Sequence, residues 1–204
     1  MNLSENHEYK LLLSEFRWIN QPKEFSIEND RLTIITEPGT DLWQRTYYGF
    51  RNDNAPLFIK EVEGDFTFAV KTVHEPVSQY DQCGIIIYGD RENWVKAAVE
   101  YENKQFGRLG SVVTNLGFSD WASADISAAI HSMVYRISRR GQDFCIENSL
   151  NGEHYQQMRI FHMHNPVLVA KVGVFACSPL NSSFKAVFSD FETGYCKWPE
   201  PHGD

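Results

Sequence analysis

The sequence predicts an all-β fold in which two antiparallel sheets pack face to face as a jelly-roll sandwich. Apolar and polar residues alternate along most segments, as in DFTFAVKTV at 65–73, and a period of two is the pattern of a half-buried strand. Turn signals such as Asn151-Gly152 separate neighbouring segments at short intervals. About a dozen short strands of this kind are typical of a sandwich rather than of a mixed α/β fold.

The expected strands can be placed in chain order. They lie within 31–38, 65–73, 83–90, 94–101, 108–115, 133–141, 143–152, 154–163, 167–179 and 184–192. Residues 119–130, SDWASADISAAI, are rich in alanine, so we expect a short helical turn or an irregular loop there. The chain has no internal repeat and no linker, which predicts a single domain over 1–204, with its core at about 11–196 and loose termini.

Charge and cysteine spacing argue against several classes of function. The net charge is −8 at pH 7 and the longest basic run is the pair Arg139–Arg140, so we expect no nucleic-acid partner. The four cysteines include no CxxC pair, which argues against a zinc knuckle or a thioredoxin-like redox centre. Residues 1–16 carry charges and only three consecutive leucines, so they predict neither a signal peptide nor a membrane span. We therefore expect a cytoplasmic protein with reduced thiols, no membrane association and no cofactor.

Several segments together resemble one known family. They are TDLWQRTYYGF at 40–50, YDQCGIIIYGDRENWVKAAVEY at 80–101, SVVTNLGFSDW at 111–121, YRISRRGQDFCIENSLNGEHYQQMRIF at 135–161, and VGVFACSP with FSDF within 172–191. In this order they resemble an uncharacterised family of concanavalin-A-like lectin/glucanase proteins, which includes a yeast protein named for the regulation of enolase. The resemblance covers about residues 16–192 and implies a jelly roll whose concave sheet can hold a ligand. It implies no particular reaction, and the fold alone does not choose between binding a sugar and cleaving one.

A sugar site is the first functional hypothesis. Such sites combine flat aromatic faces, which cover the apolar side of a pyranose, with amides and carboxylates that reach its hydroxyls. The aromatic candidates each stand beside polar residues in the sequence, although core packing competes as an explanation, most of all for Trp94. We expect the ligand-binding residues to be Trp43, Tyr48, Asp81, Gln82, Trp94, Lys96, Glu100, Asp120, Trp121 and Arg136.

Cleavage of a glycosidic bond is the alternative. It generally requires two carboxylates at about 5–10 Å, and Glu100 could serve with Asp81 or Asp120. Strand geometry places Glu100 and Glu102 about 6.8 Å apart, but we expect Glu102 to lie in a hairpin turn and face solvent. Glucanases of the wider superfamily have a central aspartate between such glutamates, and Val99-Glu100-Tyr101-Glu102 lacks it. That difference argues against hydrolysis.

Lys96 lies on the same face of its expected strand as Trp94, Ala98 and Glu100. An ion-pair network of Lys96, Glu100 and Arg136 would keep Glu100 ionised, which suits binding better than proton donation. A charged sheet face that is simply covered by water is the competing explanation.

His162 and His164 alternate like two metal ligands on a strand, but no third ligand is spaced nearby, so we expect no metal site. The first hypothesis is therefore a non-catalytic, lectin-like domain that binds a sugar or another small polar ligand on its concave sheet. A third hypothesis comes only from the yeast member of the family. It is a protein-interaction module that regulates a metabolic enzyme, for which a protein partner or a homodimer would be expected.

Overall fold

The computed structural model describes residues 9–165 and 169–200, and the regular structure in that part of the chain is one 3₁₀ turn, Leu13–Glu15, and seventeen strands. The first sheet consists of β1 (Tyr9–Lys10), β3 (Glu24–Glu28), β4 (Arg31–Ile35), β8 (Phe66–Glu75), β13 (Ser132–Arg140), β14 (Asp143–Ser149), β15 (Gln156–His162) and β17 (Lys185–Gly194). The second consists of β2 (Arg17–Ile19), β7 (Leu57–Glu63), β9 (Gln82–Asp90), β10 (Asn93–Tyr101), β11 (Phe106–Asn115), β12 (Phe118–Ser127) and β16 (Val169–Cys177). A short separate hairpin is formed by β5 (Leu42–Gln44) and β6 (Arg51–Asp53).

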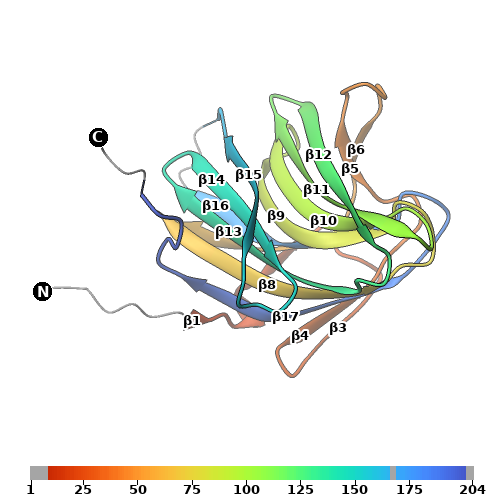
Figure 1. Ribbon diagram of the computed structural model, residues 1–204, viewed down its shortest axis with the longest axis horizontal. Helices are drawn as coiled ribbons and strands as arrows, with labels where there is room; N and C mark the ends of the chain where they lie inside the picture. Colours follow the sequence, from red (N-terminus) through yellow and green to blue (C-terminus); the bar gives the residue numbers. More distant parts are fainter. Residues whose placement is uncertain (1–8, 166–168, 201–204) are drawn as a thin grey trace, which may run out of the picture.

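The two sheets form the predicted antiparallel sandwich (Figure 1). The strand order is β15-β14-β13-β8-β17-β4-β3 in the first sheet, with β1 beside β17, and β12-β11-β10-β9-β16-β7-β2 in the second. Every strand pairing in both sheets is antiparallel. The strands β9 to β12 curve, and the β5–β6 hairpin stands on the concave side of that curve (Figure 1).

The side chains of β10 show how the second sheet separates its two faces. Val95, Ala97 and Val99 are buried in the core between the sheets. The alternate residues therefore point to the concave face, because successive side chains of a strand leave it on opposite sides. A smaller apolar cluster fills part of that face beneath the hairpin, and it includes Trp94 and Ala98. The second sheet is thus packed on one face and only partly covered on the other.

Each segment predicted as a strand overlaps an observed one, although residues 166–168 lie outside the described part of the chain. The prediction of a helical turn or loop at 119–130 is wrong for residues 119–127. Residues 119–127 belong to β12 (Phe118–Ser127), which pairs with β11 along its whole length, from Phe106 opposite Ser127 to Asn115 opposite Phe118, and only residues 128–130 lie beyond it, at a turn. β12 is an edge strand of the second sheet, and most of its residues are exposed, so no apolar alternation marks it. The ladder to β11 outweighs the helix preference of its alanines.

The four cysteines are all free, three of them buried. None of the described residues forms a helix long and apolar enough to cross a membrane.

Candidate ligand-binding site

A cavity of about 700 Å³ opens on the concave face of the second sheet. Ala98 and Gly110 line its floor, where the register of neighbouring strands brings small residues together. Ala98 of β10 stands opposite Gly84 of β9 on one side and Gly110 of β11 on the other. Paired residues of an antiparallel sheet project from the same face, so at this level the three strands present no side chain larger than a methyl group. The hollow exists because side-chain volume is missing there.

The rows on either side of this floor carry polar groups. Glu100 pairs with Gln82 of β9 on one side and with Arg108 of β11 on the other. Lys96 precedes Ala98 by two residues on β10, so Lys96 and Glu100 lie on opposite sides of the floor. All four of these polar side chains line the cavity. The sheet thereby places a cation, an acid, an amide and a guanidinium on one face around a shallow apolar centre.

Aromatic rings form the walls. Trp43, Tyr48 and Phe50 come from the β5–β6 hairpin and its loop, and Trp121 comes from the edge strand β12. The Trp121 ring lies close over Gly110, since a Cβ atom added to that glycine would be 2.7 Å from Nε1 of Trp121.

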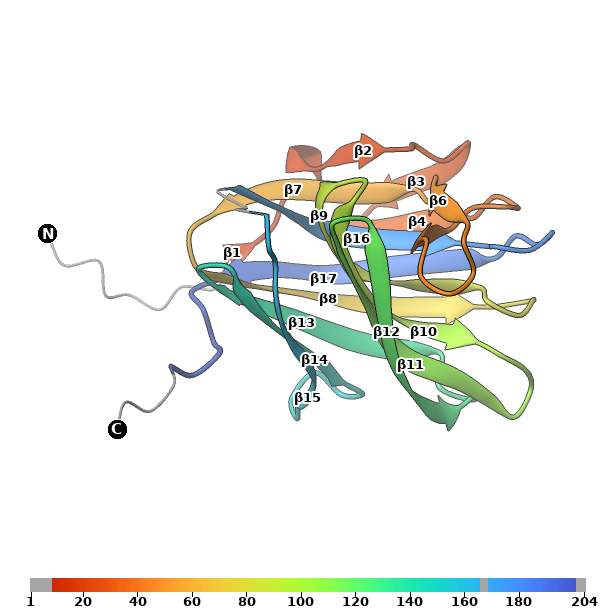
Figure 2. The same ribbon diagram turned by 90° about the horizontal axis from the view of Figure 1, so that it is seen from above.

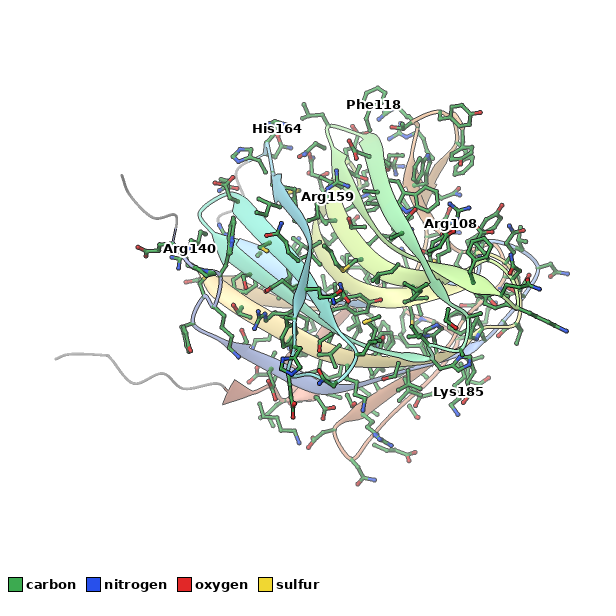
Figure 3. All side chains as sticks on the ribbon, in the orientation of Figure 1. Arg108, Phe118, Arg140, Arg159, His164 and Lys185 are labelled. Atoms are coloured by element: carbon green, nitrogen blue, oxygen red, sulfur yellow. The ribbon has the colours of Figure 1, made fainter. Side chains whose placement is uncertain are left out.

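The guanidinium carbon of Arg108 lies 5.6 Å from the centre of the Trp121 ring, within cation–π range. Figure 3 labels Arg108 on the side of the second sheet that carries the hairpin. This contact gives Trp121 a second neighbour beside Gly110 and helps to hold the indole at the wall of the cavity.

The hairpin is held to the sheet by buried and partly buried hydrogen bonds. The backbone N–H of Gln44 donates to Oγ of Ser119 over 2.9 Å, and that hydroxyl is also 2.8 Å from Oγ1 of Thr114. Nη1 of Arg45 donates to the carbonyl oxygen of Gly117 over 2.7 Å. These bonds join β5 and its loop to β11 and β12, so the aromatic residues of the hairpin are held over the sheet.

Lys96 is a buried cation with unused donors. Its side chain is 6% exposed, and Nζ lies 3.6 Å from Oδ1 of Asp41, a separation that makes an ion pair but not a hydrogen bond. The ammonium group also lies 5.5 Å from the ring centre of Phe175 and 6.0 Å from that of Trp94. No group within 9–165 and 169–200 accepts a hydrogen bond from Nζ, although Lys96 lines the cavity. Its three N–H donors are therefore available to a ligand.

Glu100 is the acid of the floor, and Nε2 of Gln82 donates to its Oε2 over 2.8 Å. Burial raises the pKa of Glu100 to about 7, the negative charges of Asp41 and Glu102 act in the same direction, and the cations Lys96 and Arg108 act against it. We expected an ion-pair network that keeps Glu100 ionised, and this expectation is wrong. Burial of the carboxyl group outweighs the attraction of Lys96, and the ion pair of Lys96 is made with Asp41.

Arg136, the third member of the expected network, lies on β13 in the other sheet. It makes a two-pronged ion pair with Glu147, with hydrogen bonds of 2.7 and 2.8 Å, and its guanidinium stacks 3.9 Å from the ring centre of Tyr155. The sequence could not show that Arg136 lies in the other sheet, because strands that follow one another along the chain often belong to different sheets of a sandwich. Arg136 does not line the cavity.

Glu102 also differs from the expectation that it faces solvent. Its side chain is only 11% exposed and lines the same cavity as Glu100. Nε of Arg108 donates to its Oε1 over 2.7 Å, and Nε2 of Gln79 donates to its Oε2 over 2.7 Å. Both carboxylate oxygens are thus occupied, which holds Glu102 as the partner of Arg108.

Two further predicted residues serve the fold rather than the cavity. Asp81 is fully buried and accepts hydrogen bonds from the backbone N–H groups of Val77 and Ser78, each 2.9 Å, and from the hydroxyl of Ser182 at 2.7 Å. Trp94 is fully buried beneath the hairpin. Neither lines the cavity. Asp120 lines a neighbouring cavity, where it pairs with Arg159 over 2.7 Å.

The structure therefore brings together six of the ten predicted residues: Trp43, Tyr48, Gln82, Lys96, Glu100 and Trp121. Sequence reasoning missed other residues of the lining, among them Asp41, Phe50, Tyr80, Glu102 and Arg108. Arg108 could have been found, because a hairpin around Asn103 places it opposite Glu100. Asp41 could not, since nothing local indicates that its loop reaches Lys96. No group of three or more His, Cys, Asp or Glu among the described residues is arranged to hold a metal ion.

A family model described as "Protein of unknown function (DUF1349)" matches residues 18–196. The chain belongs to this family. A relative of this DUF1349 protein is Regulation of enolase protein 1 of Saccharomyces cerevisiae, which is 31% identical over 181 residues, covering 88% of this chain and 89% of the relative. A crystal structure described as a functionally unknown protein from Saccharomyces cerevisiae superposes with a TM-score of 0.83 at 29% identity, covering 94% of this chain and 99% of that one.

More distant structures share the fold. A GH43 protein from Bacillus licheniformis superposes on 92% of this DUF1349 chain with a TM-score of 0.69 at 17% identity, over 38% of its own length. The exoplasmic/lumenal domain of VIP36, in a Ca²⁺/Man3GlcNAc-bound form, superposes with a TM-score of 0.57 at 8% identity, covering 99% of this chain and 93% of that one. The predicted concanavalin-A-like jelly roll is confirmed.

Proposed function

We propose that the concave cavity binds a neutral sugar or a closely similar polyol and releases it unchanged. The observation that carries this proposal is that two polar groups in the cavity with aromatic walls have hydrogen-bonding capacity left over. Nζ of Lys96 donates no hydrogen bond, and Oε1 of Glu100 accepts none, among the residues that the structure describes. A sugar offers hydroxyls that both accept and donate, so neighbouring hydroxyls would satisfy both groups while a ring face lies against Trp121.

The charge balance favours a neutral ligand. Lys96 forms an ion pair with Asp41, and Arg108 forms one with Glu102. Below about pH 7, where Glu100 is mostly protonated, the cavity carries equal numbers of cations and anions. An anionic or cationic ligand would leave one charge of the site or of the ligand uncompensated, which is costly in a partly desolvated cavity.

Titration of neutral sugars into the purified protein by calorimetry tests the proposal, with release of reducing ends followed in the same samples. We expect binding without release. Trp121→Ala should weaken binding about tenfold, and Lys96→Met about ten- to a hundredfold, as for lost hydrogen bonds from a charged donor. Tyr195→Ala removes an exposed aromatic outside both cavities and serves as the matched control. Equal binding by Trp121→Ala, Lys96→Met and Tyr195→Ala would contradict the proposal.

Glycoside cleavage is a second candidate, and one observation favours it. Burial raises the pKa of Glu100 to about 7, which is the property a general acid needs near neutral pH. The other carboxylate alternatives, Asp81 and Asp120, do not line this cavity, and Glu102 is held by Arg108 and Gln79. Sugar release that depends on pH through about 7 and disappears in Glu100→Gln would establish cleavage. Absence of release by the wild-type protein would exclude it for the glycans tried.

A regulatory protein contact is the third candidate. It is supported by the name of the yeast relative, Regulation of enolase protein 1, and by exposed aromatic rings on the hairpin loop, of which Tyr47 is 94% exposed and Tyr48 54%. Co-purification of a metabolic enzyme with the tagged chain, unaffected by added sugar and lost in Tyr47→Ala, would support this function over sugar binding.

We also propose that the protein works in a reducing compartment such as the cytoplasm. The support is that Cys83, Cys145, Cys177 and Cys196 are all unpaired. Imaging of the tagged protein in cells tests this, and accumulation in an oxidising compartment would contradict it.

A further inference from the structure

A second cavity, of about 860 Å³, opens between β12 and β15. Each is an edge strand of its sheet, and the two are neighbours on the same side of the sandwich in both views (Figure 1; Figure 2). Asn115, at the end of β11, joins the two sheets here. Its Nδ2 donates to the carbonyl oxygen of His162 over 3.0 Å, and its Oδ1 accepts from the backbone N–H of His164 over 3.1 Å. The second cavity is therefore built into a hydrogen-bonded junction of the sheets.

The two cavities share part of their walls. Trp43, Tyr48 and Trp121 line both. The rings of Trp43 and Tyr48 meet edge to face with centres 5.4 Å apart. A ligand long enough to leave the first cavity across Trp121 and Tyr48 would enter the second without losing contact with aromatic surface.

Three side chains labelled in Figure 3 belong to the two linings. Arg159 is labelled between β15 and β12, Phe118 at the start of β12, and Arg108 on the hairpin side of β12. These positions agree with the linings, because Arg159 and Phe118 belong to the second cavity and Arg108 to the first. A path between the two cavities therefore runs around the edge of the second sheet.

Arg159, Asp120 and His162 of the second cavity are already partnered. Nη2 of Arg159 donates to Oδ1 of Asp120 over 2.7 Å, and Nδ1 of His162 lies 2.6 Å from Oδ1 of Asp143. What the cavity offers beyond these pairs is mainly aromatic surface, including the exposed rings of Tyr47 and Phe118. This composition suits a neutral sugar ring better than an anionic group.

The combined size indicates a chain of sugars. Each cavity alone lies within the range of about 300–1,000 Å³ that is typical for a small-molecule site, and the two together exceed it. We infer that the protein binds one linear, neutral oligosaccharide lengthwise, with one end over the Lys96–Glu100 floor and the other in the second cavity. This inference rests on the proposed sugar binding in the first cavity.

Calorimetry with matched di- and hexasaccharides of xylose, glucose and mannose tests the inference. In the series that binds, we expect the hexasaccharide to bind about three- to tenfold more tightly than the disaccharide, as for one or two added aromatic contacts. Tyr47→Ala and Phe118→Ala each change a residue that lines only the second cavity. Both should reduce this gain and leave the disaccharide affinity unchanged, while Tyr195→Ala should change neither.

The outcomes separate the inference from the function on which it rests. Equal affinities for the two lengths, or a length gain that survives both Tyr47→Ala and Phe118→Ala, would overturn the lengthwise path and leave sugar binding in the first cavity intact. If no disaccharide or hexasaccharide binds the wild-type protein, the proposed function fails and the inference fails with it. Thermal unfolding of each variant confirms that it is folded before affinities are compared.

Discussion

The side-chain amide of Gln82 donates a hydrogen bond of 2.8 Å to Oε2 of Glu100, from the strand directly beside it. The bond fixes one oxygen of the carboxyl group, while Oε1 accepts no hydrogen bond from any residue that the structure describes. Burial raises the pKa of this group to about 7, so its acid and anion coexist near neutral pH. The floor of the cavity is therefore sensitive to pH.

Glu100→Gln should make the protein more stable at alkaline pH. The folded protein holds the Glu100 proton up to about pH 7, whereas an unfolded glutamate loses it near 4.5. Stability is therefore lost as pH rises from about 4.5 to 7, by up to about 3 kcal/mol. The glutamine variant lacks this loss and still accepts the Gln82 hydrogen bond through its amide oxygen. Urea unfolding at pH 5 and pH 8 measures the difference, and the same pH dependence in variant and wild type would refute the prediction.

His74 should make the folding stability depend on pH in the opposite direction. Burial lowers its pKa to about 4, and the nearby His131 adds to the effect. An unfolded histidine takes up a proton below about 6.5, so stability is present above that pH and is lost as pH falls toward 4. His74→Leu should flatten the decline between pH 6.5 and pH 4.5 in thermal unfolding. His154→Leu, at an exposed histidine, is the control, and an equal effect of both substitutions would rule out burial as the cause.

Gly110→Ala should reduce ligand binding without a change at any polar group. The new Cβ would lie 2.7 Å from Nε1 of Trp121 and 3.0 Å from the carbonyl oxygen of Ala122, so the indole must move off the wall of the cavity. We expect a loss of affinity of about tenfold, similar to that of Trp121→Ala. Ser123→Ala, at the residue opposite Gly110 on β12, serves as the control in the same titration. Unchanged affinity in Gly110→Ala would show that the Trp121 position does not matter for binding.

Ser119→Ala should loosen the hairpin. The substitution leaves the buried N–H of Gln44 without its acceptor, which costs about 1–3 kcal/mol in the free energy of unfolding. Thr114→Val is the matched comparison, because it removes the second bond of the Ser119 hydroxyl and keeps the bond to Gln44. Urea unfolding should show the larger loss for Ser119→Ala. Equal losses would mean that the Gln44 bond contributes nothing of its own.

Alternation along the chain was enough to predict the fold class and most of the strands. It also placed Lys96 and Glu100 on one face of β10, since side-chain direction in a strand depends only on neighbouring residues. It failed for β12, because an exposed edge strand carries no apolar period. The same local reasoning assigned Trp94 to the correct face but could not show that the hairpin covers it.

The tertiary structure alone decided which residues surround Lys96 and Glu100. The floor of the hollow depends on the register that aligns Ala98 with Gly110. The charge balance depends on Asp41, which lies in a loop more than fifty residues before Lys96 in the sequence. Register and long-range pairing arise from packing across the whole sandwich, so no local pattern encodes them. The sequence by itself determined the strands and their faces, and packing determined the cavity and the protonation of Glu100.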